Sequence, residues 1–520
     1  MRLCLVVAIA IAVLGDARAA ALALGLASDI RTLDPHRALT PAETTVAAHV
    51  FETLVTLDPR SKPVPALATE WVREDEKTWR LTLRRNVKFQ DDTALTAEDV
   101  ALSLERAMKA RPQLAMGGDP GWLTATEIDP SHVKLKTAAA YSLLLQDLAL
   151  IRIVSAKSIR ASDAAPASDV TLAGTGRYRI AGRDGDAVEL RPYRQYWGTR
   201  ATWDAVTLRA LPVDSERIDA LLSNGVNAIE RIPPQMIDRL RNDKSLKVYQ
   251  AVSGRLMYLA LGTHRVNPPG LTYADQASSA PNPLLDRRVR RAISEAIDRR
   301  ELVATVLHGS GQPAGQLVPR GYLGHVPELY GDALDVADAR ALLQEAGFPN
   351  GFSLTVHGPK DVYPADADVL AAIARMLRNV GIEADAVSEP GAAFASRGSR
   401  QQYSAFLRGF ITTTRDASVP LRAVLATHDP KTGAGSVNWS RYSNGTLDGL
   451  IESAMSQGSV EARQLLLQEA TILAMKDNAL VPLYFTYDVW ATRADYVLET
   501  RLDGLLMADS LKLRSKRKQP

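Results

Sequence analysis

Residues 65–108 have the sequence PALATEWVREDEKTWRLTLRRNVKFQDDTALTAEDVALSLERAM, and this stretch decides the fold class. Trp79, Leu81 and Leu83 alternate with polar side chains, which predicts a β-strand with one buried face. Thr96 then stands where a helix N-cap is expected, with Asp99 three positions later, so a helix is predicted to follow. A strand and a helix joined within one short segment indicate a mixed α/β protein.

The same mixture continues along the 520 residues. Apolar residues between Asp286 and Leu307 recur at three- and four-residue spacing, which predicts one helix over that whole segment. Four prolines between Val266 and Pro283 predict a long surface loop. Because one hydrophobic core does not grow to this chain length, two or three domains are expected.

The charge of the chain is concentrated at its ends. The sequence has 62 basic and 59 acidic side chains, a formal net charge of +3. Five of the basic residues lie in the last ten positions and residues 1–19 add one net positive charge, so the remaining body carries −3. A slightly acidic body lacks the positive field that binds a phosphate backbone. Nucleic acid is therefore not expected as a partner.

The first nineteen residues resemble an export signal. Arg2 precedes an apolar run from Leu3 to Leu14, and Gly15, Asp16 and the A-x-A pattern Ala17-Arg18-Ala19 follow. As a helix this run would span about 18 Å, short of the roughly 30 Å of a bilayer core. We predict a signal peptide cleaved near Ala19, with a buried N-terminal helix as the alternative. The single cysteine, Cys4, lies inside the run and not behind it, so no lipid anchor is expected.

The sequence lacks the motifs of common enzymes and metal sites. The eight histidines are at least thirteen residues apart, and the dipeptide Gly-Lys of a phosphate-binding loop does not occur. Ser131 and Lys134 match a Ser-x-x-Lys nucleophile motif, but their alternating surroundings predict a strand, which would point the two side chains in different directions. No Gly-x-Ser-x-Gly elbow is present. We therefore expect no enzyme activity, no metal and no cofactor.

Seven segments in a fixed order resemble the family 5 extracellular solute-binding proteins, the oligopeptide and dipeptide receptors of ABC importers. Residues 65–108 carry the most specific part, with "PALA", "VKF" and "LTAEDV". The other six are "TLDP" (32–35), "GTGRYRI" (174–180), "YWG" (196–198), "DRRVRRAISEAIDRRELV" (286–303), "RYSNGTLDGLI" (441–451) and "VPLY" (481–484). Together they span more than four hundred residues.

The resemblance implies a type II periplasmic-binding-protein fold, with two α/β lobes joined by hinge strands and an extra third domain. A ligand between the lobes favours the closed form because it contacts both of them. We expect a soluble periplasmic monomer that binds a small solute or short peptide and delivers it to an ABC permease with ATPase subunits. The implied segments are a signal peptide (1–19), domain I in three pieces (20–54, 171–258, 478–510), domain II (55–170), domain III (259–477) and a basic tail (511–520).

The family's peptide receptors hold the ligand ammonium with an aspartate in a segment resembling "GW-x-x-D-x-x-D/E". In the matching residues 409–416, Phe410 replaces the tryptophan and Thr413 replaces the aspartate, which leaves Asp416 as the acidic residue. Asp416 is therefore the expected electrostatic anchor. Arg408 is expected to bind a ligand carboxylate or, alternatively, to pair with Asp416 inside the protein.

Further ligand contacts are expected from apolar and hydroxyl side chains. Phe410, Tyr484 and Trp490 would supply apolar walls, with a place in the core as the alternative for each. Thr40 would donate a hydrogen bond from a loop that the resemblance places beside the ligand.

Other functions remain open at this point. The ligand could be a sugar-derived compound or a metal chelate in place of a peptide. The chain could also be an exported hydrolase acting on peptides or glycans, or a chaperone-like protein that binds extended chains without transport.

Overall fold

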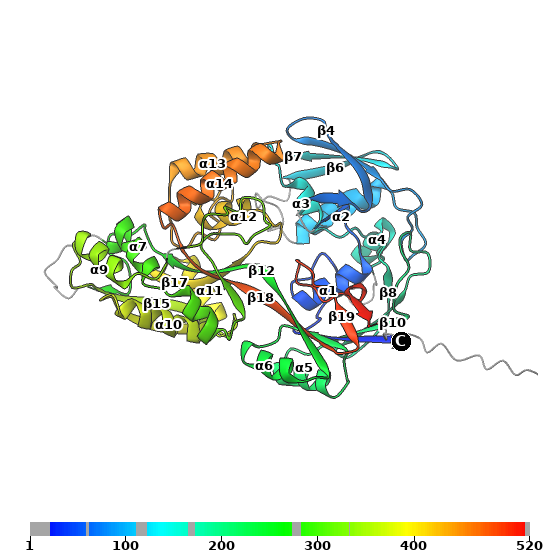
Figure 1. Ribbon diagram of the computed structural model, residues 1–520. Helices are drawn as coiled ribbons and strands as arrows, with labels where there is room; N and C mark the ends of the chain where they lie inside the picture. Colours follow the sequence, from blue (N-terminus) through cyan, green and yellow to red (C-terminus); the bar gives the residue numbers. More distant parts are fainter. Residues whose placement is uncertain are drawn as a thin grey trace, which may run out of the picture.

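The computed structural model describes residues 21–58, 62–110, 122–164, 172–272, 282–331 and 333–514. The molecule has two lobes, which are joined by two long antiparallel strands, β12 (Leu246–Leu261) and β18 (Val481–Arg493) (Figure 1). The expected signal peptide (residues 1–19) and residues 515–520 of the expected tail lie outside the described residues.

One twelve-stranded sheet passes through both lobes, with β12 and β18 side by side at its centre. On the β12 side the sheet continues through β17, β15 and β13, with β16 also paired to β15; β14 pairs with β18. On the β18 side the order is β11, β1, β10, β9 and β8. The remaining strands are β1 (Ala21–Leu26), β8 (Tyr178–Asp184), β9 (Ala187–Pro192), β10 (Ala205–Ala210), β11 (Ala228–Glu230), β13 (Leu271–Thr272), β14 (Gly311–Pro313), β15 (Ser353–Lys360), β16 (Glu383–Pro390) and β17 (Ala405–Ile411).

The first lobe, at the right of Figure 1, contains the β8–β11 side of this sheet and a second, four-stranded sheet in the order β4-β5-β7-β6. Each sheet packs on its own hydrophobic core. The further elements of this lobe are β2 (Val55–Leu57), β3 (Pro63–Pro65), β4 (Ala68–Arg73), β5 (Thr78–Leu83), β6 (Leu123–Asp129), β7 (His132–Thr137), β19 (Tyr496–Leu498), β20 (Leu511–Leu513), α1 (Pro41–Val50), α2 (Ala97–Ala110), α3 (Leu144–Leu148), α4 (Ala156–Ala164), α5 (Asp214–Leu222), α6 (Ile237–Asn242), and the 3₁₀ turns η2 (Pro234–Met236) and η6 (Ala508–Ser510).

The strand and helix predicted in residues 65–108 are confirmed. The strand is β5, in which Leu81 and Leu83 are buried against the core. The helix is α2, and the Asp99 carboxylate accepts hydrogen bonds from the backbone amide (2.7 Å) and hydroxyl (2.8 Å) of Thr96. These bonds satisfy a polar group at the helix start, which fixes where α2 begins.

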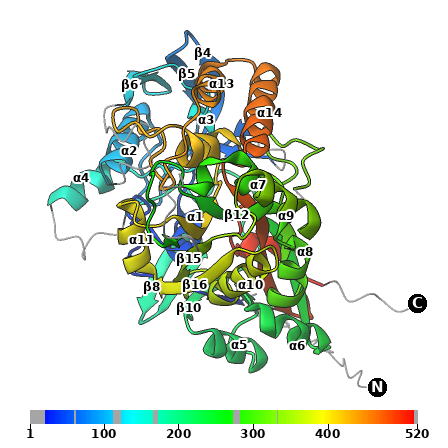
Figure 2. The ribbon, with the colours of Figure 1, turned by 90° about the vertical axis from the view of Figure 1, so that its left-hand side faces the viewer.

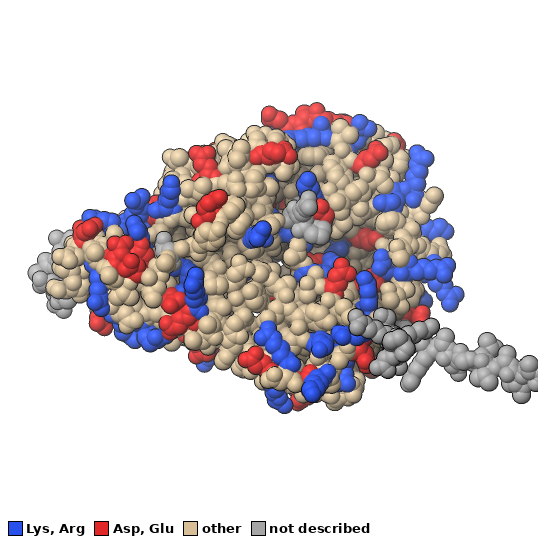
Figure 3. Space-filling model, in the orientation of Figure 1, with Lys and Arg blue, Asp and Glu red and all other residues tan. Residues whose placement is uncertain are grey.

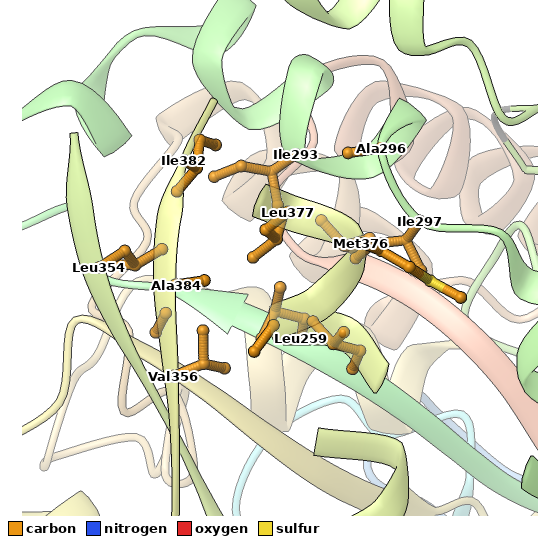
Figure 4. Close-up of a cluster of buried hydrophobic side chains, with 14 of the residues drawn as sticks. Leu259, Ile293, Ala296, Ile297, Leu354, Val356, Met376, Leu377, Ile382 and Ala384 are labelled. Atoms are coloured by element: carbon orange, nitrogen blue, oxygen red, sulfur yellow. The ribbon is translucent and has the colours of Figure 1, made fainter. Parts of the chain in front are cut away.

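The second lobe contains the β13–β17 side of the large sheet, and helices pack on it (Figures 1 and 2). In the close-up of its core, Leu259 of β12 and Val356 of β15 lie beside Ile293 and Leu377 from two helices (Figure 4). The elements are α7 (Arg287–Glu295), α8 (Arg299–Glu301), α9 (Val336–Glu345), α10 (Asp366–Arg378), α11 (Gly391–Ser399), α12 (Ser418–Pro420), α13 (Gly445–Ser456), α14 (Val460–Lys476), the 3₁₀ turn η3 (Pro283–Leu285) and the π-helical turns η4 (Leu302–Val306) and η5 (Leu421–Leu425).

The single helix predicted over residues 286–307 is wrong in one respect, because the structure divides it into α7, α8 and η4. The break comes before Asp298, whose carboxylate accepts hydrogen bonds from the backbone amides of Arg300 and Glu301, both at 2.9 Å. An aspartate in that position caps a new helix start. The apolar spacing continues across the break, since both sides face the same core.

The C-terminal segment returns to the first lobe and is anchored there. The expected tail begins with β20, which pairs with β19. Just before it, the backbone amide of Ala508 donates to His49 Nε2 (3.0 Å), and His49 Nδ1 lies 2.7 Å from the Thr45 carbonyl oxygen. Burial lowers the pKa of His49 to about 4. A neutral ring satisfies both contacts, so this anchor depends on an uncharged histidine.

The surface carries mixed charge. On the face shown in Figure 3, basic and acidic side chains of the described residues are interspersed over both lobes. Among the described residues, no helix is both long and apolar enough to cross a membrane.

Candidate ligand-binding site

The connecting strands β12 and β18 lose their register midway between the lobes. Residues 253–255 of β12 lie opposite the single residue Thr486 of β18, and the hydroxyls of Ser253 and Thr486 are 2.7 Å apart. A bulge of this kind bends a strand and changes the direction of its side chains. The bulge therefore marks the place where the sheet passes from one lobe to the other.

Gly254, in the middle of the bulge, allows two segments of the second lobe to approach the strand. A Cβ atom at this position would lie 2.6 Å from the Thr412 carbonyl oxygen and 2.7 Å from the Tyr322 hydroxyl. The backbone amide of Thr412 also donates a hydrogen bond to the Gly254 oxygen (3.0 Å). Only glycine fits here without a shift of the loop that follows β17.

Arg255 is the last residue of the bulge. Its guanidinium lies over the ring of Tyr363, 5.6 Å from the ring centroid, and no described residue forms a hydrogen bond or ion pair with it. Tyr363 in turn donates to the Gly409 carbonyl oxygen (3.3 Å). Burial is the main cause that lowers the pKa of Arg255, and the positive charge of Arg231 also lowers it. Tyr363 and Asp488 act in the opposite direction. Arg255 thus faces groups from both lobes.

Asp488 lies on β18 opposite Ala251 of β12, on the first-lobe side of the bulge. One of its carboxylate oxygens would be 2.7 Å from a Cβ at Gly504, so the side chain lies against that backbone, and no described residue donates a hydrogen bond to it. Burial raises the pKa of Asp488, while Arg231 and Arg255 lower it. Arg255, Arg231 and Asp488 together, here called the hinge charge cluster, carry one net positive charge.

A second charged group lies further along the boundary between the lobes. Arg415, in the loop after β17, donates to the Asp58 carbonyl oxygen of the first lobe (2.9 Å). Burial lowers the pKa of Arg415, and Asp503, which is paired with Arg501 (2.5 Å), acts in the opposite direction. Ser142 of the first lobe also donates its backbone amide to the Met455 oxygen of the second (2.9 Å). The lobes therefore touch at two places besides the connecting strands.

Three buried hydroxyls near the bulge lack hydrogen-bond partners among the described residues. They belong to Thr412, Thr414 and Tyr484, which are all less than 5% exposed. A buried hydroxyl without a partner costs free energy, and such groups are rare in folded proteins. Their position beside the bulge, together with the unpaired charges, makes this region the candidate ligand-binding site.

The expected anchor, Asp416, has a different partner in the structure. Both carboxylate oxygens are bound by the Arg463 guanidinium, at 2.5 and 2.9 Å, and one also accepts from the backbone amide (2.9 Å) and hydroxyl (2.6 Å) of Ser418. Asp416 is only 1% exposed. The carboxylate is already neutralised inside the second lobe by Arg463. The expected internal pair of Asp416 with Arg408 is therefore wrong, because Arg408 has other contacts.

The same carboxylate affects a residue of the other lobe. The pKa of Asp147 in α3 is raised to about 7. Burial is the largest cause, and the charge of Asp416 adds to it. The Tyr141 hydroxyl, which donates a hydrogen bond to Asp147 (2.5 Å), acts in the opposite direction. The charge of Asp416 in the second lobe therefore acts on Asp147 in the first.

Arg408, Phe410 and Thr413 lie with Asp416 on β17 and its following loop, but they point to different surroundings. Arg408 donates to the Val437 carbonyl oxygen (3.1 Å) and lies 3.6 Å from the ring centroid of Trp439. Phe410 is half-buried at the edge of a second-lobe core, and Thr413 is exposed.

The remaining three expected contacts have other roles in the structure. Trp490 is 1% exposed and belongs to the core of the first lobe, so the core alternative holds for it. Tyr484 packs in the core of the second lobe, although its hydroxyl is one of the three without a partner. The Thr40 hydroxyl is the N-cap of α1, where it accepts from the Glu43 backbone amide (3.1 Å) and donates to the Asp29 oxygen (2.9 Å).

Sequence reasoning missed Arg255, Asp488 and Tyr363. Arg255 directly precedes the apolar run 256–261, and a charge at the edge of a buried strand was the available signal. That signal alone does not separate a ligand contact from a solvated side chain. Among the described residues no group of three histidine, cysteine or acidic side chains is arranged to hold a metal ion.

Comparisons with known proteins agree with this architecture. The glutathione-binding protein GsiB of Salmonella choleraesuis is 26% identical over 474 residues, which cover 88% of each chain. The periplasmic murein peptide-binding protein MppA of Escherichia coli is 24% identical over 87% of this chain and 85% of its own. The solved structure of HbpA2 from Haemophilus parasuis has a TM-score of 0.82 at 21% identity and covers 95% of this chain and 100% of that one.

The fold is accordingly that of a two-lobed periplasmic binding protein, as the sequence resemblance implied. The model of the bacterial extracellular solute-binding proteins, family 5, matches residues 62–431, which is more than half of the chain. The protein belongs to family 5 of the bacterial extracellular solute-binding proteins.

Proposed function

We propose that this protein is the substrate-binding receptor of an ABC importer, which captures a peptide or peptide-like solute between its lobes and delivers it to a membrane permease. The observation that carries the proposal is the hinge charge cluster, in which Arg255 and Asp488 have no bound partner among the described residues. A peptide carries both a carboxylate and an ammonium, so its ends match these two charges. Two relatives are named for glutathione and for a murein peptide, which is in keeping with such a ligand.

The position of the cluster explains how binding would produce a signal. Arg255 and Asp488 lie on the two strands that connect the lobes, and Arg231 and Tyr363 approach them from opposite lobes. A ligand can shift an open-closed equilibrium only by binding one form more tightly than the other. A solute held by both lobes does this, because opening breaks half of its contacts.

We also propose that the chain is exported, works as a monomer and leaves its ligand chemically unchanged. The apolar run in residues 3–14 supports export, and the family supports a binding role without catalysis. Permease and ATPase subunits would be separate chains.

Binding can be tested by isothermal titration of the purified protein with glutathione, tri-alanine and a metal chelate such as Fe(III)-EDTA. We expect saturable one-to-one binding of at least one peptide-like probe, with the same molecule recovered by mass spectrometry. Closure should appear as a smaller radius of gyration in X-ray scattering. Binding of the chelate alone would assign a different ligand class, and a changed probe would indicate an enzyme.

A further inference from the structure

The bulge in β12 places a cation where the two lobes meet, and no carboxylate of a described residue forms a hydrogen bond or ion pair with it. Arg255 has five N–H donors and no acceptor. Its guanidinium lies over the face of Tyr363, and no described residue accepts a hydrogen bond from its N–H groups. The nearby Arg231 and Asp488 do not neutralise the site, because two positive charges face one negative charge.

Several features show that this cation is built into the fold. The bulge exists because three residues of β12 oppose one of β18, and its centre must be glycine to admit Thr412 and Tyr322. Tyr363 is itself fixed by its hydrogen bond to Gly409. An arginine held in this way, beside buried hydroxyls without partners, is prearranged to bind a planar anion.

We propose that Arg255 is the specificity-determining residue of the binding site and that it selects solutes by binding one of their carboxylates. This inference rests on the proposed function. It narrows the ligand class to peptides and peptide-like acids with a free carboxylate, and it excludes the same compounds when that carboxylate is an ester or an amide. Asp488 then faces the cationic part of the same solute.

The alternative is that Arg255 only supports the hinge. Both roles predict weaker binding when Arg255 is lost, but they differ in which ligands are affected. A carboxylate contact affects only ligands that carry the carboxylate. A structural role affects free acids and amides to the same degree.

The test combines a change in the protein at Arg255 with a change in the ligand at its carboxylate, and compares the affinities of all combinations. Wild type, Arg255→Ala and Arg255→Lys are titrated with tri-alanine and tri-alanine amide, and with glutathione and its glycine monoethyl ester. Arg239→Ala is the matched control, since Arg239 is an exposed arginine on α6. Circular dichroism and thermal melts establish that each variant is folded.

For wild type we expect at least one free acid to bind more than tenfold tighter than its blocked form. In Arg255→Ala the ratio of the two affinities should fall below threefold, and the blocked form should bind as it does to wild type. Arg255→Lys should give an intermediate ratio, because lysine keeps the positive charge but lacks the paired N–H donors of a guanidinium. Arg239→Ala should behave as wild type. Equal loss of acid and blocked form in Arg255→Ala, or equal binding of both by wild type, would overturn the role of Arg255. If wild type binds none of the four probes, the proposed function fails instead.

Discussion

The ion pair between Asp416 and Arg463 offers the sharpest test of how the second lobe is built. Asp416 is 1% exposed and Arg463 is 3% exposed, and they share two hydrogen bonds of 2.5 and 2.9 Å. Asp416→Asn keeps the shape of the side chain and removes its charge. The Arg463 guanidinium then stays buried without the carboxylate that it is paired with.

The expected cost follows from that uncompensated charge. Removal of one partner of a buried ion pair typically lowers the free energy of unfolding by about 3 to 5 kcal/mol. Arg463→Met should cost a similar amount, because it leaves Asp416 with only the two bonds from Ser418. The double variant removes both charges of this pair, so its cost should be clearly smaller than the sum of the two single costs.

Urea denaturation of the four proteins, followed by Trp fluorescence, measures this cycle. Asp385→Asn is the control, since Asp385 is exposed on β16. A loss of less than about 1 kcal/mol in Asp416→Asn, or strict additivity in the double variant, would refute the reasoning. Ligand affinity of folded Asp416→Asn should stay within about threefold of wild type; a tenfold loss would restore Asp416 as a ligand anchor.

Three further perturbations have defined outcomes. Gly254→Ala should weaken ligand binding at least tenfold, because the new Cβ would displace Tyr322. The control Gly445→Ala, at a helical position with open space around it, should bind as wild type. Equal ligand affinity of the two variants would contradict the close packing at the bulge. His49 has a folded pKa of about 4 against an ordinary 6.5, so its stabilising effect is complete above pH 6.5 and is lost as the pH falls towards 4. His49→Gln should flatten the pH profile of the unfolding free energy by about 3 kcal/mol in that window, and an unchanged slope would reject the assignment. Asp147 has a pKa of about 7 in the folded protein, above its ordinary 3.8, so the wild-type protein loses stability as the pH rises towards 7. Asp147→Asn cannot lose a proton, so its unfolding free energy relative to wild type should rise by about 3 kcal/mol between pH 5 and pH 8. A difference in urea melts that stays constant with pH would argue against this assignment.

Features that depend on neighbouring residues could be predicted from the sequence. The alternation at Leu81 and Leu83 specifies β5, since a strand exposes every second side chain to the same core whatever its partners are. The same logic failed within 286–307, where apolar spacing ran on past a break. Asp298 was the local sign of that break, because an aspartate often begins a helix.

The candidate site could not be predicted in the same way, because it depends on residues far apart in the chain. Asp416 and Arg463 are 47 positions apart, and Ser253 and Thr486, which mark the bulge, are 233 apart. Nothing near Asp416 in the sequence shows that its charge is already paired. Likewise, Arg255 acquires its place between the lobes only when β12 and β18 pair out of register.

The same bulge also has a mechanical consequence. When two rigid lobes rotate about a hinge, the residues at the hinge move least and the surfaces farthest from it move most. Arg255 lies at the bulge in the connecting strands, and the outer surfaces of both lobes lie far from it. A small rotation at the bulge, caused by a solute bound to the Arg255 guanidinium, would therefore produce a large displacement of those surfaces. If the proposed function holds, exchange of this one side chain would change which molecule triggers closure and would leave the outer surfaces of both lobes unchanged.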